Sequence, residues 1–577
     1  SLFDQIPLDQ MNTSMTINAT APWLLSLYIA AAEEQGADIS KLQGTVQNDL
    51  IKEYLSRGTY ICPPAPSLKM IADVAEYCYT HVPKWNPMNV CSYHLQEAGA
   101  TPEQELAFAL ATAQAVLDEL QPRIAPEDFP AMVGRISFFV NAGIRFVTEM
   151  CKMRAFVDLW DEICRDRYGV ENPKFRRFRY GVQVNSLGLT EQQPENNVYR
   201  ILIEMLAVTL SKKARARAVQ LPAWNEALGL PRPWDQQWSM RMQQILAYET
   251  DLLEYEDLFE GNPAVDRKVQ TLKDDARAEL ANLQSMGGAV ASIDYMKSRL
   301  VDSNAERLNR IERNETVVVG VNSWTEGEPS PLQTEDGGIM VVDPAVEQEQ
   351  ITRLNAWRQA RDADAVATAL ADLRAAARAG DNIMPASIAA AKAGVTTGEW
   401  AEEMRRVHGT YRGPTGVSGS PSNKTEGLDD LREAVNAASD QLGRRLKFVV
   451  GKPGLDGHSN GAEQIAFRAR DCGMDITYNG IRMTPEELVA QAQDDGAHVV
   501  GLSILSGSHM PLVEELMQRM REANLGHIPV VVGGIIPDDD AEKLNQMGVS
   551  RVYTPKDFEL NTIMADIVEL SYPSKTA

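Results

Sequence analysis

The segment 451–461, GKPGLDGHSNG, places a histidine in a glycine-rich turn between an apolar run and a helical run. His458 is one of only seven histidines in the chain, and Asp456 precedes it by two residues. A carboxylate can hold one imidazole nitrogen while the other nitrogen binds a metal. Because no second histidine or cysteine stands near, the metal would arrive with its other ligands already supplied. The segment therefore predicts a metal-bearing cofactor, with His458 as the protein's ligand and Asp456 as its orienting partner.

The elements around this turn predict how it is positioned. Five apolar runs, each followed by a helical pattern, lie at 446–451, 475–480, 498–505, 528–534 and 550–554, and the last helix is expected over 556–571. This alternation predicts a doubly wound, flavodoxin-like (Rossmann-like) parallel sheet of about 130 residues. In such sheets ligands bind at the carboxyl ends of the strands, so the loops after the first, third and fourth strands should meet around His458.

The residues alone leave three hypotheses for this sheet. A flavin or phosphate site is one, although neither G-x-x-x-x-G-K-[ST] nor G-x-G-x-x-G occurs here. A phosphoryl-accepting receiver domain is the second, but it would need acidic residues after the first strand, where the chain reads VVGKPG. The third is a macrocyclic metal cofactor with His458 as axial ligand.

The first 250 residues also alternate strand-like and helical patterns. The expected strands are 11–17, 42–47, 88–93, 135–140, 179–184 and 215–221, and the expected helices are 22–36, 67–81, 101–121, 143–168, 195–211 and 233–250. Six parallel β/α units are predicted. A closed (β/α)₈ TIM barrel needs eight, so we expect the first two units to precede residue 1, where the chain starts without a methionine.

The strands of this part carry unusually polar residues for a barrel. SMTINAT and GTVQND contain Ser, Thr, Asn and Gln, whereas barrel interiors are mostly filled by branched apolar side chains. Small polar residues suit a barrel with a ligand threaded through it. The alternative is that these positions face solvent at a sheet edge.

Between the two sheets the chain reads as mostly helical. Residues 250–320, 344–380 and 384–409 show helical patterns, 315–324 (ETVVVGVNSW) predicts a strand, and 409–427 is a Gly-, Pro- and Ser-rich linker. We expect three domains: the barrel over 1–265, a helical connecting region and linker over 266–427, and the flavodoxin-like domain over 428–577.

The composition narrows the class of protein. The 577 residues are 44% hydrophobic and carry a net charge of −24, which argues against nucleic acid or an anionic membrane as the main partner. A local basic cluster at 212–218 could still meet an anionic small molecule. Six scattered cysteines without metal spacing favour a reduced, cytoplasmic protein, and no apolar run has the length of a membrane span.

Three motifs in the last domain carry a resemblance. D-x-H-x-x-G at 456–461, GLSILSG and VVVGGIIP, in this order and spacing, resemble the signature of cobalamin-binding domains in which a histidine replaces the cofactor's own base. The earlier segments GTVQNDLIKEYLSRGTYICPP, SYHLQEAGAT, GRISFFVNAG and QVNSLGLTEQQPENN resemble the acyl-CoA mutase barrel of the methylmalonyl-CoA mutase type, and are most similar to its ethylmalonyl-CoA mutase branch.

The resemblance implies an activity and a set of partners. It implies adenosylcobalamin as cofactor, an acyl-CoA as substrate, a homodimer, and a reactivating chaperone as a possible partner. The reaction would interconvert ethylmalonyl-CoA and methylsuccinyl-CoA by a radical 1,2-shift of the thioester carbonyl group, with methylmalonyl-CoA as the alternative substrate. Family members begin earlier, with strands that carry a substrate-side tyrosine.

The resemblance also implies roles for individual residues. Arg57 would pair with the substrate's free carboxylate, His94 would polarise the thioester carbonyl, and Tyr93 would crowd the adenosyl group. The remaining substrate-binding residues would be Ser14, Thr16, Thr45, Gln47, Arg135, Ser137 and Gln183. Of these, Arg135 and Ser137 would contact coenzyme A. The cofactor would be held by His458, on the cobalt, and by Glu97, Glu204, Lys452, Asp456, Gly457, Gly461, Ser503, Leu505, Gly533, Gly534, Tyr553 and Thr554. The glycines in that set would give the cofactor clearance.

Two departures from the methylmalonyl pattern bear on substrate choice. The turn 184–188 (VNSLG) lacks a bulky tryptophan, and 212–223 lacks a histidine; we expect both at the active-site face, reshaped for a longer acyl branch. Arg57 favours a dicarboxylic acyl group over isobutyryl- or 2-hydroxyisobutyryl-CoA, because a monocarboxylic substrate would leave that charge unpaired. A non-catalytic cobalamin carrier or metallochaperone is the hypothesis from a different class. The polar barrel and the absence of a GTPase P-loop argue against it.

Overall fold

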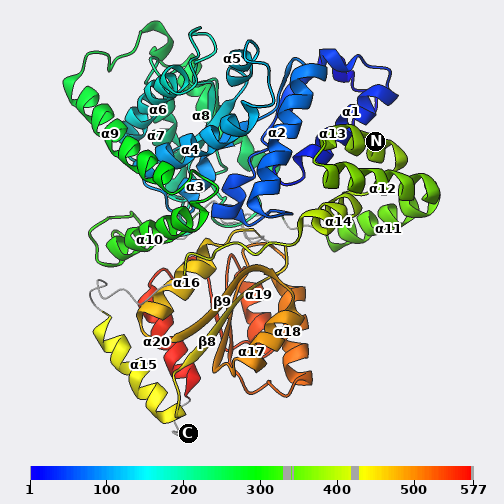
Figure 1. The fold of residues 1–577 in the computed structure, drawn as a ribbon. Helices are drawn as coiled ribbons and strands as arrows, with labels where there is room; N and C mark the ends of the chain where they lie inside the picture. The colour runs from blue at the N-terminus through cyan, green and yellow to red at the C-terminus, as the bar shows by residue number, and fades with distance from the viewer. Residues whose placement is uncertain are drawn as a thin grey trace.

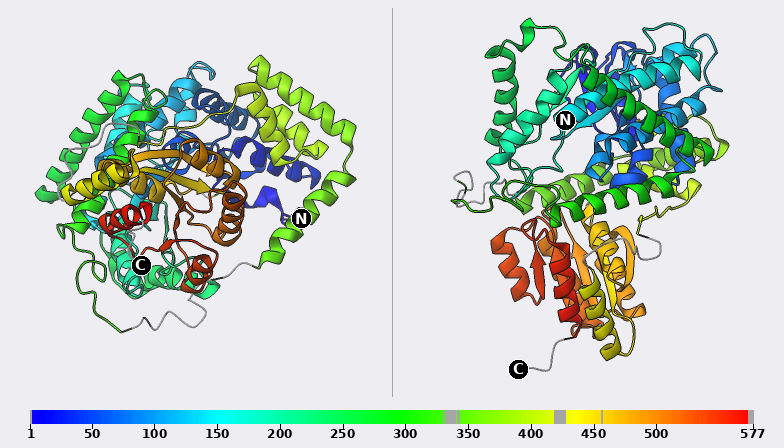
Figure 2. Two further views of the ribbon diagram at one scale, coloured as in Figure 1. Left: turned by 90° about the horizontal axis from the view of Figure 1, so that it is seen from below. Right: turned by 90° about the vertical axis from the view of Figure 1, so that its left-hand side faces the viewer.

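Two lobes, stacked one on the other, make up the molecule (Figure 1). The computed structural model describes residues 2–328, 330, 340, 343–417, 428–455 and 457–572. Residues up to 417 form the upper lobe of Figure 1 and residues from 428 the lower one. Helix α10 (Ile293–Glu312) runs along the boundary between them, as the right-hand view of Figure 2 shows.

The upper lobe is built on six parallel strand units, as the sequence predicts. The strands are β1 (Asn12–Met15), β2 (Gln43–Val46), β3 (Trp85–Asn86), β4 (Asn89–Cys91), β5 (Ser137–Ala142), β6 (Tyr180–Val184) and β7 (Ala218–Gln220). They form the sheets β1-β2-β3 and β4-β5-β6-β7, all in parallel register. β3 and β4 are one unit interrupted at Pro87, which has no backbone N–H to donate. The amide of Asn89 donates to the carbonyl of Gln47 (2.8 Å), so the strand arc continues across the interruption.

Helices follow the strands and cover the outside of this arc. They are α1 (Ala21–Glu34), α2 (Pro64–His81), α3 (Tyr93–Glu97), α4 (Pro102–Leu120), α5 (Phe129–Val133), α6 (Phe146–Asp166), α7 (Asn196–Thr209) and α8 (Pro233–Tyr248). α4 begins in a capping box between Thr101 and Gln104. It is buried on nearly every side because α2, α6 and α9 (Pro263–Ser285) pack around it, which explains its apolar sequence.

The strand alternation points small polar residues to the inside of the arc. On β1, Thr13 bonds Tyr28 of α1 (3.0 Å) and Met15 packs against the adjoining core. Ser14, which lies between them, therefore faces the opposite side, next to Thr45 in the neighbouring strand, and it is exposed there. Ser14 and Thr45 thus line the inside of the barrel arc.

One predicted strand of the upper lobe is wrong. After α9 (Pro263–Ser285) and α10, residues 315–324 form a tight loop closed by a single bridge between Val319 and Ser323. The side chain of Asn322 accepts from the Val318 amide (2.8 Å) and donates to the Ile311 carbonyl (2.9 Å). Local hydrogen bonds from an asparagine thus replace the sheet ladder that the valine run suggested.

Four further helices pack back onto the start of the chain. α11 (Pro344–Ala360), α12 (Ala363–Ala379), α13 (Ile383–Ala393) and α14 (Thr397–His408) confirm the predicted helical stretches, the first split in two near residue 361. α13 packs along α1. Trp23 of α1 stacks on Trp400 of α14 with ring centroids 6.0 Å apart and donates to Thr397 (3.0 Å).

The lower lobe has the predicted flavodoxin-like topology. Its strands are β8 (Lys447–Pro453), β9 (Asp475–Met483), β10 (Val499–Ser503), β11 (Val530–Gly533) and β12 (Arg551–Tyr553), paired in parallel in the order β9-β8-β10-β11-β12. One face is covered by α15 (Asp429–Leu442), α16 (Asn460–Asp471) and α20 (Leu560–Ser571), the other by α17 (Pro485–Asp494), α18 (His509–Glu522) and α19 (Asp538–Gln546). The strand order reverses between β8 and β10, the point where such sheets bind ligands.

Candidate active site

The loop between β8 and α16 rests on the upper lobe. A Cβ on Gly457 would lie 2.7 Å from the carbonyl oxygen of Arg57, so only glycine fits this contact. Asn460, the first residue of α16, donates to the carbonyl of Glu97 (2.8 Å). Since these upper-lobe residues follow the carboxyl ends of β2 and β4, the loop that carries His458 lies over the carboxyl-terminal edge of the barrel arc.

Arg57 ends a single turn of π-helix, η3 (Glu53–Arg57), which Gly58 terminates with φ +61°. π-turns are rare and are frequent at functional sites. The guanidinium of Arg57 lies 3.6 Å from the carboxylate of Glu97, and both side chains keep partial exposure. Arg57 therefore presents a cation at the interlobe gap that a second carboxylate could reach.

His94 lies in α3 and is buried, with 4% of its surface exposed. Its Nδ1 is 2.7 Å from the Nζ of Lys52. Burial, followed by the charges of Lys52, Arg57 and His458, holds the pKa of His94 well below its ordinary value. His94 is therefore a neutral imidazole at neutral pH.

Tyr93 packs beside His94. Their ring centroids are 3.7 Å apart, and Phe139 of β5 meets Tyr93 edge-on at 5.4 Å. The amide of Gln47 hydrogen-bonds the Tyr93 hydroxyl, while burial raises the pKa of this tyrosine. Arg57, His94, Tyr93, Gln47 and Glu97, which the sequence assigned separately, are thus neighbours on one edge.

Several buried polar atoms beside this edge lack hydrogen-bond partners among the described residues. The unpartnered atoms are Glu204 Oε2, Gln96 Oε1 and both side-chain polar atoms of Asn141. Burial and the carboxylate of Glu149 raise the pKa of Glu204 well above its ordinary value. Buried polar groups are rarely left unpaired, so this cluster fits a ligand rich in hydrogen-bonding atoms.

Two of these positions were missed in the sequence. Asn141 is the next-to-last residue of β5, in FVNAG, where a polar residue in an apolar strand marks the carboxyl-terminal edge. Gln96 lies in the segment between His94 and Glu97. The position of Asn141 at the end of a strand could have indicated a site residue. For Gln96 the sequence offers only its place between His94 and Glu97.

Glu226 is a third residue that the sequence did not single out. Burial and the carboxylate of Glu97 raise the pKa of Glu226 to about 7, while His458 and Arg57 act in the opposite direction. Its side chain is exposed, yet charged groups of both lobes act on it, Glu97 and Arg57 from the upper lobe and His458 from the lower one. Glu226 therefore lies between the two edges that form the site.

The lower lobe contributes a row of strand-end residues to the same gap. Ser503, Gly533 and Tyr553 end β10, β11 and β12 in register with one another. Lys452 of β8 is fully buried, and its Nζ donates to the Ser503 carbonyl (3.3 Å) across the point where the strand order reverses. Leu505 and Thr554 follow in the adjoining loops and are partly buried, whereas Asp456 lies outside the described residues.

The expectation that the glycines of this edge leave space for a cofactor holds for only some of them. A Cβ on Gly534 would lie 1.8 Å from the Ile504 carbonyl oxygen, and Gly457 is closed off by Arg57. At Gly461 and Gly533, by contrast, the nearest atoms are 3.5 Å and 3.9 Å away. Gly457 and Gly534 are thus required by backbone packing, and only Gly461 and Gly533 leave space.

Arg135 and Ser137 lie apart from the site, at the amino-terminal end of β5. Ser137 Oγ accepts from Asn89 (2.9 Å), and Arg135 donates to the Trp85 carbonyl (3.2 Å) over the ring of Tyr79. Burial lowers the pKa of Arg135. The strand from Ser137 to Ala142 spans about 16 Å, so the predicted substrate residues fall into two groups at opposite ends of the arc.

The two segments that depart from the methylmalonyl pattern, 184–188 and 212–223, lie in different places. Ser186, in the turn after Gln183, donates to the Glu97 carboxylate (3.3 Å), so 184–188 is at the active edge as expected. Residues 212–217 precede β7 and lie at its amino-terminal end. There burial, followed by the charge of Arg217, lowers the pKa of Arg179. The expectation that all of 212–223 faces the active site is therefore wrong, because only the part after β7 reaches that edge.

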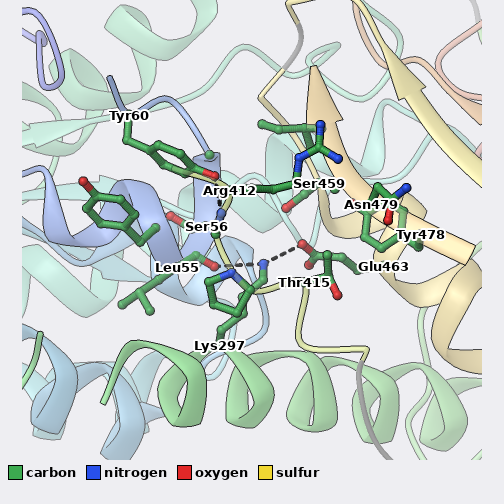
Figure 3. Close-up of a pocket in the computed structure, with 16 residues that line it drawn as sticks. Leu55, Ser56, Tyr60, Lys297, Arg412, Thr415, Ser459, Glu463, Tyr478 and Asn479 are labelled. Carbon is green, nitrogen blue, oxygen red and sulfur yellow. Dashed lines mark hydrogen bonds and ion pairs between the residues drawn. The ribbon is translucent and has the colours of Figure 1, made fainter. Parts of the chain in front are cut away.

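A cavity of about 40 Å³ lies beside this gap (Figure 3). The ammonium of Lys297, from α10, bonds the Glu463 carboxylate of α16 (2.5 Å) and the Leu55 carbonyl (3.0 Å) at its floor. Tyr60 and Arg412 line it from the upper lobe. The buried ion pair fixes how the two lobes dock along α10.

The described residues hold no group of three or more His, Cys, Asp or Glu side chains placed to bind a metal ion. None of their helices is long and apolar enough to cross a membrane.

The fold and the site define a two-lobed β/α protein whose candidate site lies between the carboxyl-terminal edges of a barrel and a flavodoxin-like sheet. Comparison with known proteins gives its family. The methylmalonyl-CoA mutase model matches residues 1–410 and the B12 binding domain model matches residues 446–557. The chain belongs to the methylmalonyl-CoA mutase family and is a cobalamin-dependent mutase, an isomerase.

Individual relatives are similar over nearly the whole chain. The ethylmalonyl-CoA mutase of Cereibacter sphaeroides is 78% identical over 99% of this chain and 87% of its own length. That of Methylorubrum extorquens is 64% identical over 100% of this chain and 85% of its own length. The methylmalonyl-CoA mutase of Cereibacter sphaeroides is 35% identical over 96% of this chain and 78% of its own length.

Proposed function

We propose that this chain interconverts ethylmalonyl-CoA and methylsuccinyl-CoA by a 1,2-shift of the thioester carbonyl group. The observation that carries the proposal is the pairing of one accessible cation, Arg57, with one neutral imidazole, His94, at the same edge. The substrate offers one carboxylate and one thioester carbonyl, which these two groups match. Similarity to two ethylmalonyl-CoA mutases supports this substrate over methylmalonyl-CoA.

Arg57 binds the free carboxylate of the acyl group. A guanidinium can donate two parallel hydrogen bonds to a carboxylate, which fixes the acyl group in orientation as well as position. Glu97 lies 3.6 Å from it, a long and partly exposed contact that a bidentate substrate carboxylate can displace.

His94 donates a hydrogen bond to the thioester carbonyl. As a neutral imidazole it polarises the carbonyl without surrendering a proton at neutral pH. Tyr93, which Gln47 hydrogen-bonds, packs against the imidazole and excludes water from the migrating group. Ser14, Thr16, Thr45 and Gln183 line the inner face along which the acyl chain extends.

Arg135 and Ser137 contact coenzyme A at the other end of the arc. A separation of about 16 Å along β5 suits a long ligand that lies along the barrel axis, with its reactive end at His94. The polar inner face supports this arrangement.

The residues between the lobes fit adenosylcobalamin. The unpartnered atoms of Glu204, Asn141 and Gln96 offer hydrogen-bonding groups to the adenosyl side, beside Glu97. His458 would hold the cobalt, with Asp456 and Lys452 as its supporting partners. Ser503 and Leu505 would border the pocket for the cofactor's nucleotide tail. The other residues that would border the cofactor are Gly457, Gly461, Gly533, Gly534, Tyr553 and Thr554. When bound, adenosylcobalamin would supply the radical chemistry of the rearrangement.

The wider organisation follows the same proposal. We assign residues 1–265 to the substrate barrel, 266–427 to the connecting region and linker, and 428–577 to the cobalamin domain. A cytoplasmic homodimer that a chaperone reactivates is the assembly we propose.

The full chain with adenosylcobalamin should be assayed on ethylmalonyl-, methylmalonyl- and isobutyryl-CoA. We expect the highest kcat/KM with ethylmalonyl-CoA and the lowest with isobutyryl-CoA, because the latter leaves Arg57 without its carboxylate. Preference for methylmalonyl-CoA would establish the alternative substrate. No turnover of any of the three would refute the proposal.

A further inference from the structure

Lys52 is a buried lysine next to the active edge. It precedes the π-turn η3 and keeps only 2% of its surface exposed. Its ammonium lies 2.7 Å from Nδ1 of His94, 3.3 Å from the carboxylate of Glu53 and 5.7 Å from the ring centre of Tyr93. The carboxylate of Glu53 also accepts from the hydroxyl of Thr59 and is thereby held in place.

The contact between Lys52 and His94 fixes which nitrogen carries the proton. An ammonium has three donors and no acceptor, so Nδ1 must contribute its lone pair to a bond of 2.7 Å. A neutral imidazole has one proton, which is then on Nε2. Protonating Nδ1 instead would bring two donors together, one of them charged, in a buried position.

We propose that Lys52 is a positioning residue that holds His94 as the neutral Nε2–H tautomer, the form that donates to the thioester carbonyl. The inference rests on the proposed function of His94 but concerns a different residue and a different atom. Lys52 touches neither the reacting carbons nor the thioester and acts only through the imidazole.

The hydrogen bond between Lys52 and His94 runs in the opposite direction to the one that many enzymes make to the second nitrogen of a histidine. In many enzymes a carboxylate or carbonyl accepts from the second nitrogen of a histidine, which makes the imidazole more basic. A donor at Nδ1 makes it less basic and leaves Nε2–H as a fixed donor. A reaction that shifts a carbonyl group without net proton transfer needs a donor of this kind rather than an acid.

The other charged groups near His94 agree with this role. Arg57, on η3, and His458, from the lower lobe, both disfavour a charged imidazole. Glu97, on the same helix as His94, pairs with Arg57, and Glu53 pairs with Lys52, so neither carboxylate is directed at the ring.

A double-variant cycle tests whether Lys52 acts through His94. We expect Lys52→Met to lower kcat about 10- to 100-fold with KM changed less than about threefold. His94→Ala should cost more, and adding Lys52→Met to it should cost nothing further. Lys273→Met, which removes a largely buried lysine from the outside of the lobe, is the matched control and should leave kcat unchanged. Additive losses from Lys52→Met and His94→Ala would overturn the proposal.

The tautomer itself can be read without any turnover. In the full chain labelled with ¹⁵N-histidine, the His94→Ala variant assigns the signal. We expect Nε2–H for His94 with no titration near neutral pH, and a mixture of tautomers that titrates at higher pH in Lys52→Met. Should the unpaired Glu53 prevent that variant from folding, Lys52→Met/Glu53→Gln replaces it. A wild-type signal with the proton on Nδ1 would overturn the inference, whatever the substrate proves to be.

Discussion

Lys152 and Lys52 are both buried in the upper lobe, but their partners differ. Lys152, between α4 and α6, is fully buried and ion-paired to two carboxylates, Glu105 (2.5 Å) and Glu149. Burial opposes its charge, yet these carboxylates raise the pKa of Lys152. Lys52 pairs with the carboxylate of Glu53 at 3.3 Å, and its shortest hydrogen bond is to the imidazole of His94.

The difference separates a structural cation from a positioning one. Glu105 also accepts from the hydroxyl of Ser92 (2.8 Å) and the amide of Asn141 (3.0 Å), so the Lys152 cluster ties α4 to the ends of β4 and β5. Such a network stabilises the scaffold under the site. The Lys52 pair directs one hydrogen bond to a group that meets the substrate, and its loss should therefore appear in catalysis before stability.

Replacing Lys152 with methionine should give the largest loss of stability. Two carboxylates would remain buried without a cation, which costs about 3–5 kcal/mol in comparable cases. Chemical denaturation of the full chain measures the free energy of unfolding of the upper lobe. Lys152→Met/Glu149→Gln, which leaves one carboxylate fewer, should recover part of the loss. A loss below about 1 kcal/mol would mean that Lys152 and Lys52 do not differ in this way.

Asp49 gives a pH test of the Lys52 region. Its carboxylate accepts from the amides of Cys91 (2.8 Å) and Lys52 (3.3 Å), and burial raises the pKa of Asp49 to about 6 despite the charge of Lys52. The folded state therefore binds more protons than the unfolded state between pH 3.8 and about 6, and stability falls as pH rises through this window.

We expect Asp49→Asn to remove this fall. The contribution of Asp49 amounts to about 3 kcal/mol across the window, since each pKa unit corresponds to about 1.4 kcal/mol. Unfolding midpoints of the wild type and the variant from pH 4 to 7 should diverge as the wild type loses stability. Parallel curves would contradict the assignment of the raised pKa to Asp49.

The sequence predicted the framework better than the site. Strand periodicity gave all eleven strand units, because alternating and continuous apolar runs are local features. Residues 315–324 failed because a valine run also fits a loop when an asparagine satisfies its backbone. The D-x-H-x-x-G motif and the resemblance gave His458, Arg57 and His94.

The rest of the site depends on contacts that no local pattern contains. Lys52 stands in NDLIKEY as an ordinary helical lysine, and only the fold brings it to His94, 42 residues away. Glu226 becomes a site residue because the fold brings it near Glu97, Arg57 and His458, which lie far from it in the sequence. Gly457 similarly looked like clearance for a ligand until the position of Arg57 was known.

Lys273→Met should have the smallest effect and so completes the comparison. Lys273 pairs with Asp158 and Glu162, each at 3.0 Å, and those side chains are 50% and 30% exposed. Water can solvate both carboxylates once the lysine is gone, so we expect a loss of about 1 kcal/mol or less that shrinks as salt is added. The same denaturation assay at low and high salt measures it. A loss as large as that of Lys152→Met would show that burial of the lysine, rather than burial of its partners, sets the cost.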